Sequence, residues 1–125
     1  MIRGVRGATT VINNDESEIL TATETLIKEM ISKNAVNPDN VASIFISVTD
    51  EITAVFPAKA LRRFEGWSFV PVMCMKEIPV QDSLKSCIRI MMHINTTKSQ
   101  EEIHHVYLEN AIQLRPDLLI HEKII

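Results

Sequence analysis

Two stretches decide the fold: Val72-Met73-Cys74-Met75-Lys76-Glu77, and Cys87-Ile88-Arg89-Ile90-Met91-Met92-His93-Ile94. The second alternates isoleucine and methionine with other residues, and successive side chains of a strand point to opposite faces. This alternation places Arg89 on the face opposite an apolar one. The first stretch leaves a hydrophobic strand and ends on a carboxylate. The short connection between them lets Glu77 and Arg89 reach the same end of a sheet, where we interpret them as the two poles of a small anion-binding site.

The residues before these stretches predict a strand, a long helix and a second strand. Residues 1–12 are rich in β-branched side chains. Asp15 begins a helix that runs to about Lys33, because Asp15 and Glu18 resemble a capping box and apolar residues then recur at helical spacing. Residues 41–48 form the next strand, apolar on both faces at its centre. This order indicates a right-handed crossover and some parallel pairing.

The remaining elements are shorter. Pro57 begins a short helix that ends at Gly66 and carries Lys59, Arg62 and Arg63, and a strand is expected over residues 67–72. Residues 99–102 are compatible with the start of a short helix. For residues 104–115 the pattern does not distinguish strand from helix.

The predicted fold class is α+β: one domain over residues 1–125, with a mixed sheet covered on one face by the long helix. One helix cannot cover both faces. The other face would leave an apolar cluster partly exposed, and such surface usually marks an interface, so we expect an oligomer. The tail, residues 116–125, is expected to be mobile. The exposed cluster comprises Trp67, Met73, Met75, Met91 and Met92.

Composition excludes several classes of protein. A net charge of −3 argues against a nucleic-acid binder, and 5% aromatic residues give no platform for stacking single-stranded bases. No apolar run is long enough to span a membrane. Residues 1–12 lack the apolar core of a secretory signal, and Cys74 and Cys87 are not in a CxxC motif. We therefore expect a cytoplasmic protein with two free thiols and no disulfide.

The motifs of metal, nucleotide and covalent catalysis are absent. His104 and His105 are adjacent and would face opposite ways in a strand, so convergent metal ligation is not expected. A Cys74–histidine nucleophilic pair stays open, although no third group stands out to orient the base.

Once these motifs are set aside, the remaining candidate site residues are mostly cations. Arginine suits bidentate binding of carboxylates, so this inventory fits a small dianion held by shape and charge. Either binding alone or a unimolecular rearrangement is compatible with it. Taken singly, Arg6 and the cations of the 57–66 helix can also be read as solvated surface charges. The full set comprises Arg6, Lys59, Arg62, Glu77, Arg89, Tyr107 and Arg115.

Several motifs in order resemble the small monofunctional chorismate mutases of the trimeric, Bacillus type. The resemblance covers nearly the whole chain, and the pattern of the all-helical chorismate mutases is absent. The motifs are Ile2-Arg3-Gly4-Val5-Arg6-Gly7-Ala8-Thr9-Thr10-Val11, Ala54-Val55-Phe56-Pro57-Ala58-Lys59-Ala60, Gly66-Trp67, Val70-Pro71-Val72, Cys74-Met75, Glu77, Cys87-Ile88-Arg89, His105-Val106-Tyr107-Leu108-Glu109 and Leu114-Arg115-Pro116-Asp117-Leu118.

The resemblance implies a homotrimeric pseudo-α/β-barrel, with three mixed sheets in the core, helices outside and three active sites at the subunit interfaces. It implies the Claisen rearrangement of chorismate to prephenate, in phenylalanine and tyrosine biosynthesis, without a cofactor or a covalent intermediate. A trimeric small-anion-binding or imine-processing protein of similar architecture is the alternative, and a regulatory module without catalysis is a third reading.

The resemblance also implies roles for individual residues. Arg89 would donate to the ether oxygen of the substrate as the C–O bond breaks, and Glu77 would meet the ring hydroxyl, with Cys74 nearby. Arg6 and Tyr107 would hold the side-chain carboxylate region.

Other residues would line the pocket. The resemblance implies one departure: Met73 stands where the best-known member of this type has a threonine, so a backbone contact can remain there but a side-chain hydroxyl is lost. The wall and rim from the neighbouring subunit would comprise Phe56, Ala58, Lys59 and Arg62, with Leu114 and Arg115 near the tail; Val72 and Met73 would also contact the substrate.

Overall fold

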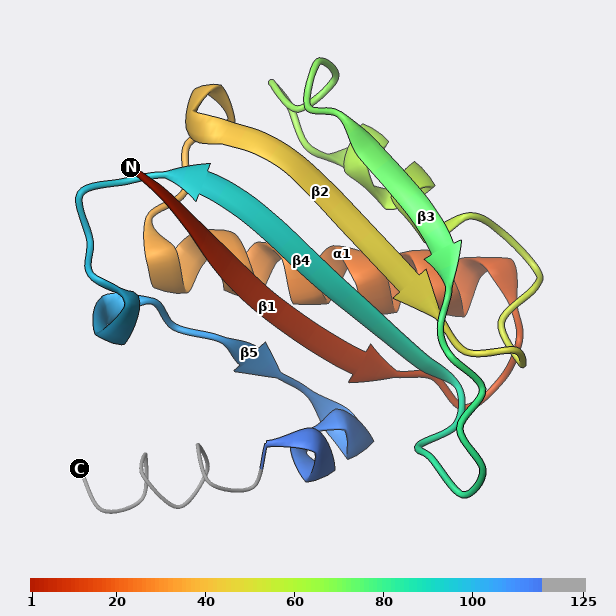
Figure 1. Ribbon diagram of the computed structural model, residues 1–125. Helices are drawn as coiled ribbons and strands as arrows, with labels where there is room; N and C mark the ends of the chain where they lie inside the picture. Colours follow the sequence, from red (N-terminus) through yellow and green to blue (C-terminus); the bar gives the residue numbers. More distant parts are fainter. Residues whose placement is uncertain (116–125) are drawn as a thin grey trace.

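A computed structural model describes residues 1–115, which form a five-stranded mixed sheet with one long helix behind it (Figure 1). The strand order is β3-β2-β4-β1-β5. Strand β4 is antiparallel to both β1 and β2, whereas the outer pairs β2–β3 and β1–β5 are parallel. The predicted α+β class with some parallel pairing is confirmed. The strands are β1 (Ile2–Thr10), β2 (Val41–Val48), β3 (Val72–Lys76), β4 (Cys87–Asn95) and β5 (Val106–Tyr107).

The helix α1 (Glu16–Asn34) begins at the predicted cap. The Asp15 side chain accepts the backbone N–H of Glu18 at 2.9 Å, which satisfies one free donor of the first turn. The Glu18 carboxylate binds the backbone N–H groups of Ile12 and Asn13 instead of that of Asp15, because the Asp15 N–H already donates to the Asn13 carbonyl. The helix ends at Ala35, which adopts a left-handed conformation and donates to Ile31.

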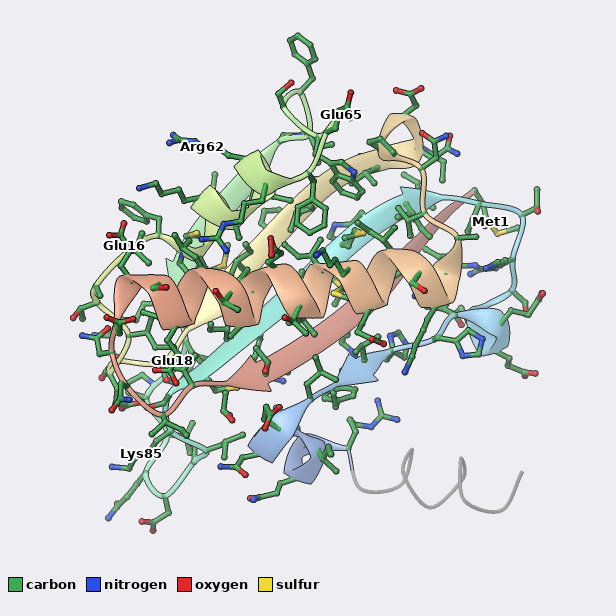
Figure 2. The ribbon with its side chains drawn as sticks, turned by 180° about the vertical axis from the view of Figure 1, so that it is seen from behind. Met1, Glu16, Glu18, Arg62, Glu65 and Lys85 are labelled. Atoms are coloured by element: carbon green, nitrogen blue, oxygen red, sulfur yellow. The ribbon has the colours of Figure 1, made fainter. Side chains whose placement is uncertain are left out.

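The apolar stripe of α1 packs across one face of β1, β4 and β2, as Figure 2 shows from behind. The alternation in β4 is confirmed, since Ile88, Ile90, Met92 and Ile94 are at most 3% exposed. These residues form one core with Val5, Ile44, Ile46, Leu26, Ile27 and Met30. None of the helices within residues 1–115 is long and apolar enough to cross a membrane.

Four short 3-10 segments connect the elements: η1 (Pro38–Asn40), η2 (Pro57–Arg63), η3 (Gln100–Glu102) and η4 (Glu109–Leu114). Segment η2 packs beside α1 and against β3. It begins at Pro57 as predicted. The undecided stretch 104–115 contains both kinds of element, β5 followed by η4.

The predicted strand over residues 67–72 is wrong, because the strand begins at Val72 and residues 68–70 form turns. Pro71 accepts a hydrogen bond from Ile44 N–H but has no N–H of its own to extend the ladder. Trp67 and Met92 are buried, contrary to the prediction. Trp67 lies in the core against Phe64, and Met92 points to the covered face.

The other face of the sheet is uncovered over its central strands in the part of the chain described (Figure 1). Strand register places Arg6, Met91, Phe45 and Met73 in one row across this surface, which we call the open face. Met73 is 61% exposed. The prediction of exposed methionines on this side is therefore confirmed for Met73 and Met75. The predicted mobile tail, residues 116–125, lies outside the described residues.

Close packing of α1 on β1 depends on Gly7. A Cβ atom added there would lie 2.5 Å from Met30 Sδ and 3.1 Å from Leu26 Cδ1, both in the core. We expect Gly7→Ala to lower the free energy of unfolding by about 1–3 kcal/mol, as overpacking does. Gly4→Ala is the matched control, since its Cβ would meet only Met91 Sδ, at 3.1 Å on the open face. Urea unfolding at one protein concentration measures both; equal stability of the two variants would contradict this account.

Candidate active site

Glu77 and Arg89 meet on the open face, as predicted. Arg89 Nη1 lies 3.2 Å from Glu77 Oε2. The Ser47 hydroxyl donates to the same oxygen at 3.0 Å, and the Ile78 backbone N–H donates to Oε1 at 3.1 Å. The Glu77 backbone N–H bonds the Val48 carbonyl at 2.8 Å, so the chain stays against β2 beyond the end of β3. The carboxylate is therefore held from three sides.

These contacts set the charge of Glu77. Burial raises the pKa of this carboxyl, but the hydrogen bonds from Ile78 and Ser47 and the charge of Arg89 outweigh burial. The pKa of Glu77 is thus lowered from its ordinary value of 4.5, and the group is ionised at neutral pH. The Arg89 side chain is 44% exposed, so it can also bind a ligand.

Arg6 and Tyr107 lie on the same face as Arg89. Ala8 of β1 pairs with Arg89 on one side and with Tyr107 on the other. Arg6 stands two residues before Ala8 on β1, so its side chain is on the same face of the sheet. Because neighbouring strands are about 4.8 Å apart, the backbones of Tyr107 and Arg89 are roughly 10 Å apart. The Arg6 backbone N–H donates to His105 Nδ1 at 3.0 Å.

A small apolar cluster supports this end of the open face. Ala8, Cys87 and Ala111 are buried there, and Leu84, Tyr107 and Leu114 pack against them. Burial, and then the charges of Arg6 and Arg115, lower the pKa of His105, so Arg115 lies near enough to act on that ring. Leu114 thus packs with Tyr107 within one chain and Arg115 follows it, whereas the resemblance grouped both with the wall of a neighbouring subunit.

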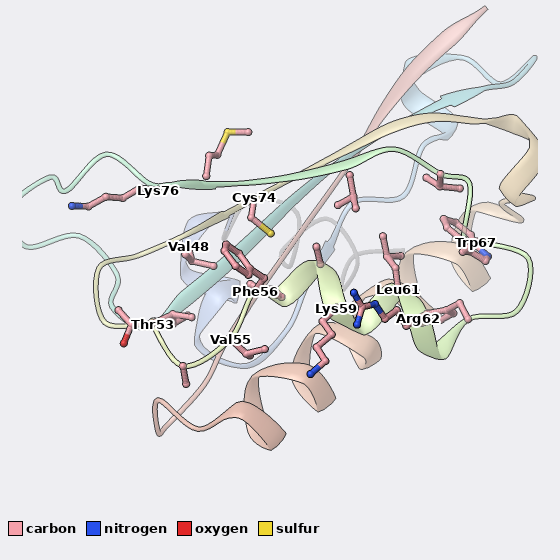
Figure 3. A pocket seen from close by; sticks show the side chains of 18 of the residues that line it. Val48, Thr53, Val55, Phe56, Lys59, Leu61, Arg62, Trp67, Cys74 and Lys76 are labelled. Carbon is pink, nitrogen blue, oxygen red and sulfur yellow. The ribbon is translucent and has the colours of Figure 1, made fainter.

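Six of the other predicted site residues line a separate groove of ≈ 1540 Å³ between η2, the following loop and β3 (Figure 3). Cys74 points from β3 into the space beside η2 where the Phe56 ring also lies. Phe56 is 76% exposed. Lys59 and Arg62 form the cationic rim. The groove includes Phe56, Ala58, Lys59, Arg62, Val72 and Cys74, and excludes Arg6, Glu77, Arg89 and Tyr107.

Strand alternation explains the separation. Val72 and Cys74 point to the groove, whereas Met73 and Glu77 belong to the open face. Cys74 and Glu77 of one chain therefore face opposite ways. The structure brings Arg6, Glu77, Arg89 and Tyr107 together on one surface and leaves the groove residues on another.

Neither cysteine suits nucleophilic catalysis. Burial raises the pKa of Cys74, against a weaker opposing hydrogen bond from the Ala58 backbone. Burial raises the pKa of Cys87 to about 11. A thiol needs a low pKa to react as thiolate at neutral pH. Both cysteines are free, as predicted. Within residues 1–115 no group of three or more His, Cys, Asp or Glu side chains is placed to hold a metal ion.

Two residues of this surface were missed by the sequence reasoning, Ser47 and His105. Ser47 interrupts the apolar run of β2 on the face that carries Phe45, and that polar break was the available signal. His105 carried no signal of its own, because its partner is the backbone of Arg6, 99 residues away.

The fold and the site define a class of protein: an α+β protein whose open face carries Arg6, Arg89 and Glu77, groups suited to a small anion, without a suitable nucleophile among the described residues. Residues 2–118 match the family described as chorismate mutase type I. The chain is 50% identical over 118 residues to a Bacillus subtilis chorismate mutase, covering 94% of this chain and 93% of that protein. It is 39% identical over 119 residues to a Thermus thermophilus chorismate mutase, covering 94% and 97%.

A solved structure gives the same result. A chorismate mutase from Clostridium thermocellum superimposes with a TM-score of 0.84 at 48% identity, covering 87% of this chain and 96% of that one. The chain belongs to the chorismate mutase type I family. Its reaction is the isomerisation of chorismate to prephenate, and the resemblance found in the sequence is confirmed.

The contact between Ser47 and Glu77 can be tested by titration. We expect Ser47→Ala to raise the pKa of Glu77, because the ionised carboxylate loses a donor at 3.0 Å. Ser43→Ala is the matched control on the same strand and face, since Ser43 contacts His93 instead. Carboxyl ¹³C shifts measured against pH report the Glu77 pKa. An unchanged value in Ser47→Ala, or an equal rise in both variants, would show that the hydroxyl does not set this charge.

Proposed function

We propose that this chain rearranges chorismate to prephenate at sites that two subunits of a homotrimer build together. The observation that supports this is the division of the predicted site between two surfaces of one chain. The open face carries Arg6, Glu77, Arg89 and Tyr107, and the groove carries the remaining wall and rim. The open face is exposed apolar surface with a charged edge, which is suited to the groove of a second copy.

In the proposed mechanism, Arg89 stabilises the transition state. As the C–O bond of chorismate breaks, negative charge grows on the ether oxygen, and the guanidinium stabilises that charge more than the ground state. Glu77 holds Arg89 from one side at 3.2 Å, and Ser47 holds Glu77. The cation is therefore already oriented before substrate binds, which avoids reorganisation during the reaction.

The other charged groups select and orient the substrate. Glu77, whose pKa is lowered from an ordinary value already well below neutral pH, is ionised and accepts the ring hydroxyl. Arg6 and Tyr107 hold the side-chain carboxylate region. Chorismate must adopt a folded diaxial conformation to react, and fixed groups at its two ends favour that conformer.

The groove of a neighbouring subunit closes the site. Phe56 and Ala58 supply the apolar wall, and Lys59 and Arg62 supply cations at the rim. Cys74 of that subunit reaches the ring hydroxyl beside Glu77, while Val72 lines the wall. Met73 contributes its backbone, and Leu114 and Arg115 border the site.

The proposed assembly is a pseudo-α/β-barrel whose interior is made by three open faces. The proposed subunit is one domain over residues 1–125, which is supported by the core that the sheet and α1 share within residues 1–115. The enzyme is cytoplasmic, serves phenylalanine and tyrosine biosynthesis and needs no cofactor, since the rearrangement is unimolecular. Family membership favours catalysis over the binding-only alternative.

The charge of Arg89 is the first test. We expect Arg89→Ala to lower kcat/KM for chorismate by about 10²–10³-fold or more, as the loss of one oxyanion donor does. Replacement by citrulline, a neutral isostere, should also slow the reaction, because it keeps the shape and removes the charge. Arg63→Ala is the control, since Arg63 pairs with Glu24 at 3.8 Å, away from the open face. Loss of chorismate absorbance measures turnover, and near-full rates in both Arg89 variants would refute the assigned role.

The division of the site between subunits is tested by mixing variants. Arg89→Ala damages the open-face half, and the double variant Lys59→Ala/Arg62→Ala damages the groove half. Each alone should be poorly active, but equal amounts refolded together should regain about one quarter of wild-type activity, because one interface in four pairs two intact halves. A site contained within one chain would give no recovery. Light scattering should give the mass of a trimer, and a monomer would contradict the assembly.

A further inference from the structure

The short strand β5 is joined to β1 partly by a side chain. Its two residues, Val106 and Tyr107, pair with Gly7 and Ala8 of β1, and the Leu108 N–H then bonds the Ala8 carbonyl at 2.9 Å. Before this ladder, the backbone N–H of Arg6 has His105 Nδ1 as its acceptor, at 3.0 Å. The imidazole therefore takes the place of a strand carbonyl at the position of an active-site arginine.

This contact fixes the protonation state of His105. A backbone N–H can only donate, so Nδ1 carries no proton and the neutral ring holds its proton on Nε2. The charged groups that act on the ring are Arg6 of β1, Arg115 at the end of η4 and the adjacent His104. Burial, followed by these three, lowers the pKa of His105 from its ordinary value of 6.5. Protonation would remove the acceptor and place a third cation beside two arginines.

The backbone that presents His105 is tied to the end of α1. Asn34, the last residue of the helix, is 3% exposed. Its Oδ1 accepts the His104 N–H and its Nδ2 donates to the His104 carbonyl, both at 2.8 Å. Nδ2 also donates to the Met30 carbonyl at 2.9 Å. The backbone before His105 is thus tied to the end of α1, while its imidazole bonds β1.

We propose that neutral His105 is a positioning residue of the active site, which fixes the Arg6 segment of β1 relative to Tyr107 and so sets how the two groups hold the substrate carboxylate. This rests on the proposed function, because it needs Arg6 and Tyr107 to bind the substrate. His105 itself is not placed to touch the reacting atoms. It acts through the backbone of Arg6.

Three variants test the proposal. His105→Leu removes the acceptor, and we expect a loss of roughly 5- to 100-fold in kcat/KM, mostly as a rise in KM, from one unpaired half-buried donor. His105→Asn keeps an acceptor oxygen near the position of Nδ1 and should recover most of that loss. His104→Leu is the matched control, because the His104 side chain is exposed and only its backbone is bonded to Asn34.

The pH profile separates positioning from mere structural support. In the wild type and in His104→Leu, kcat/KM should fall as the pH drops below 6.5 through the lowered pKa of His105, because the protonated ring cannot accept from Arg6. In His105→Asn this acid limb should disappear. Exchange of the Arg6 amide proton should be slow in the wild type and His105→Asn, and fast in His105→Leu.

The outcomes distinguish this proposal from the proposed function. If the wild type does not turn over chorismate, the proposed function is wrong. If the wild type is active and His105→Leu keeps its KM, or His105→Asn retains the full acid limb, the positioning role is wrong. Equal losses in His104→Leu and His105→Leu would also overturn it, because they would indicate general damage to the segment.

Discussion

The alternation of β4 is the constraint on which the rest of this structure depends. Ile88, Ile90, Met92 and Ile94 are directed toward α1, so Arg89 must be directed away from it. Strand β4 is central and pairs with both β1 and β2. Its register with them determines which of their side chains lie on the same face as Arg89. Arg6 and Ser47 are consequently placed on the same face as Arg89. A core packed behind the sheet and a charged site in front of it are two results of one pattern.

Much of this arrangement follows from local sequence. The period of α1 and the Asp15 cap specify the covering helix, and the period-two pattern of β4 specifies which face Arg89 occupies. The meeting of Glu77 with Arg89 also followed, because the connection between their strands is short. The uncovered face could be inferred by counting helices. Each of these features can be predicted from the spacing of apolar residues within one element, or from the number of helices available to cover the sheet, and spacing is a strong guide to both.

The features that the sequence analysis predicted wrongly or missed depend mostly on contacts between distant parts of the chain. The start of β3 at Val72 was missed although Pro71, which has no N–H to extend the ladder with β2, stands directly before it. Trp67 is buried because it joins the core and packs against Phe64. Residues 104–115 divide into β5 and η4 because their pairing with β1, a strand about 100 residues earlier, covers only Val106 and Tyr107. The role of His105 depends on a backbone group in the first strand. Long-range contacts decide most of these, and periodicity carries no trace of them.

The phase of β4 has a consequence for how this chain can change in evolution. Inserting or deleting one residue within the strand would exchange its two faces for every position beyond the change. Arg89 would enter the core under α1 while Ile90 faced the substrate, so stability and catalysis would be lost together. Loops such as residues 78–86 have no alternation of side chains to preserve, so they can change length. Relatives should therefore differ in length between strands, while the span from Cys87 to Asn95 keeps its length.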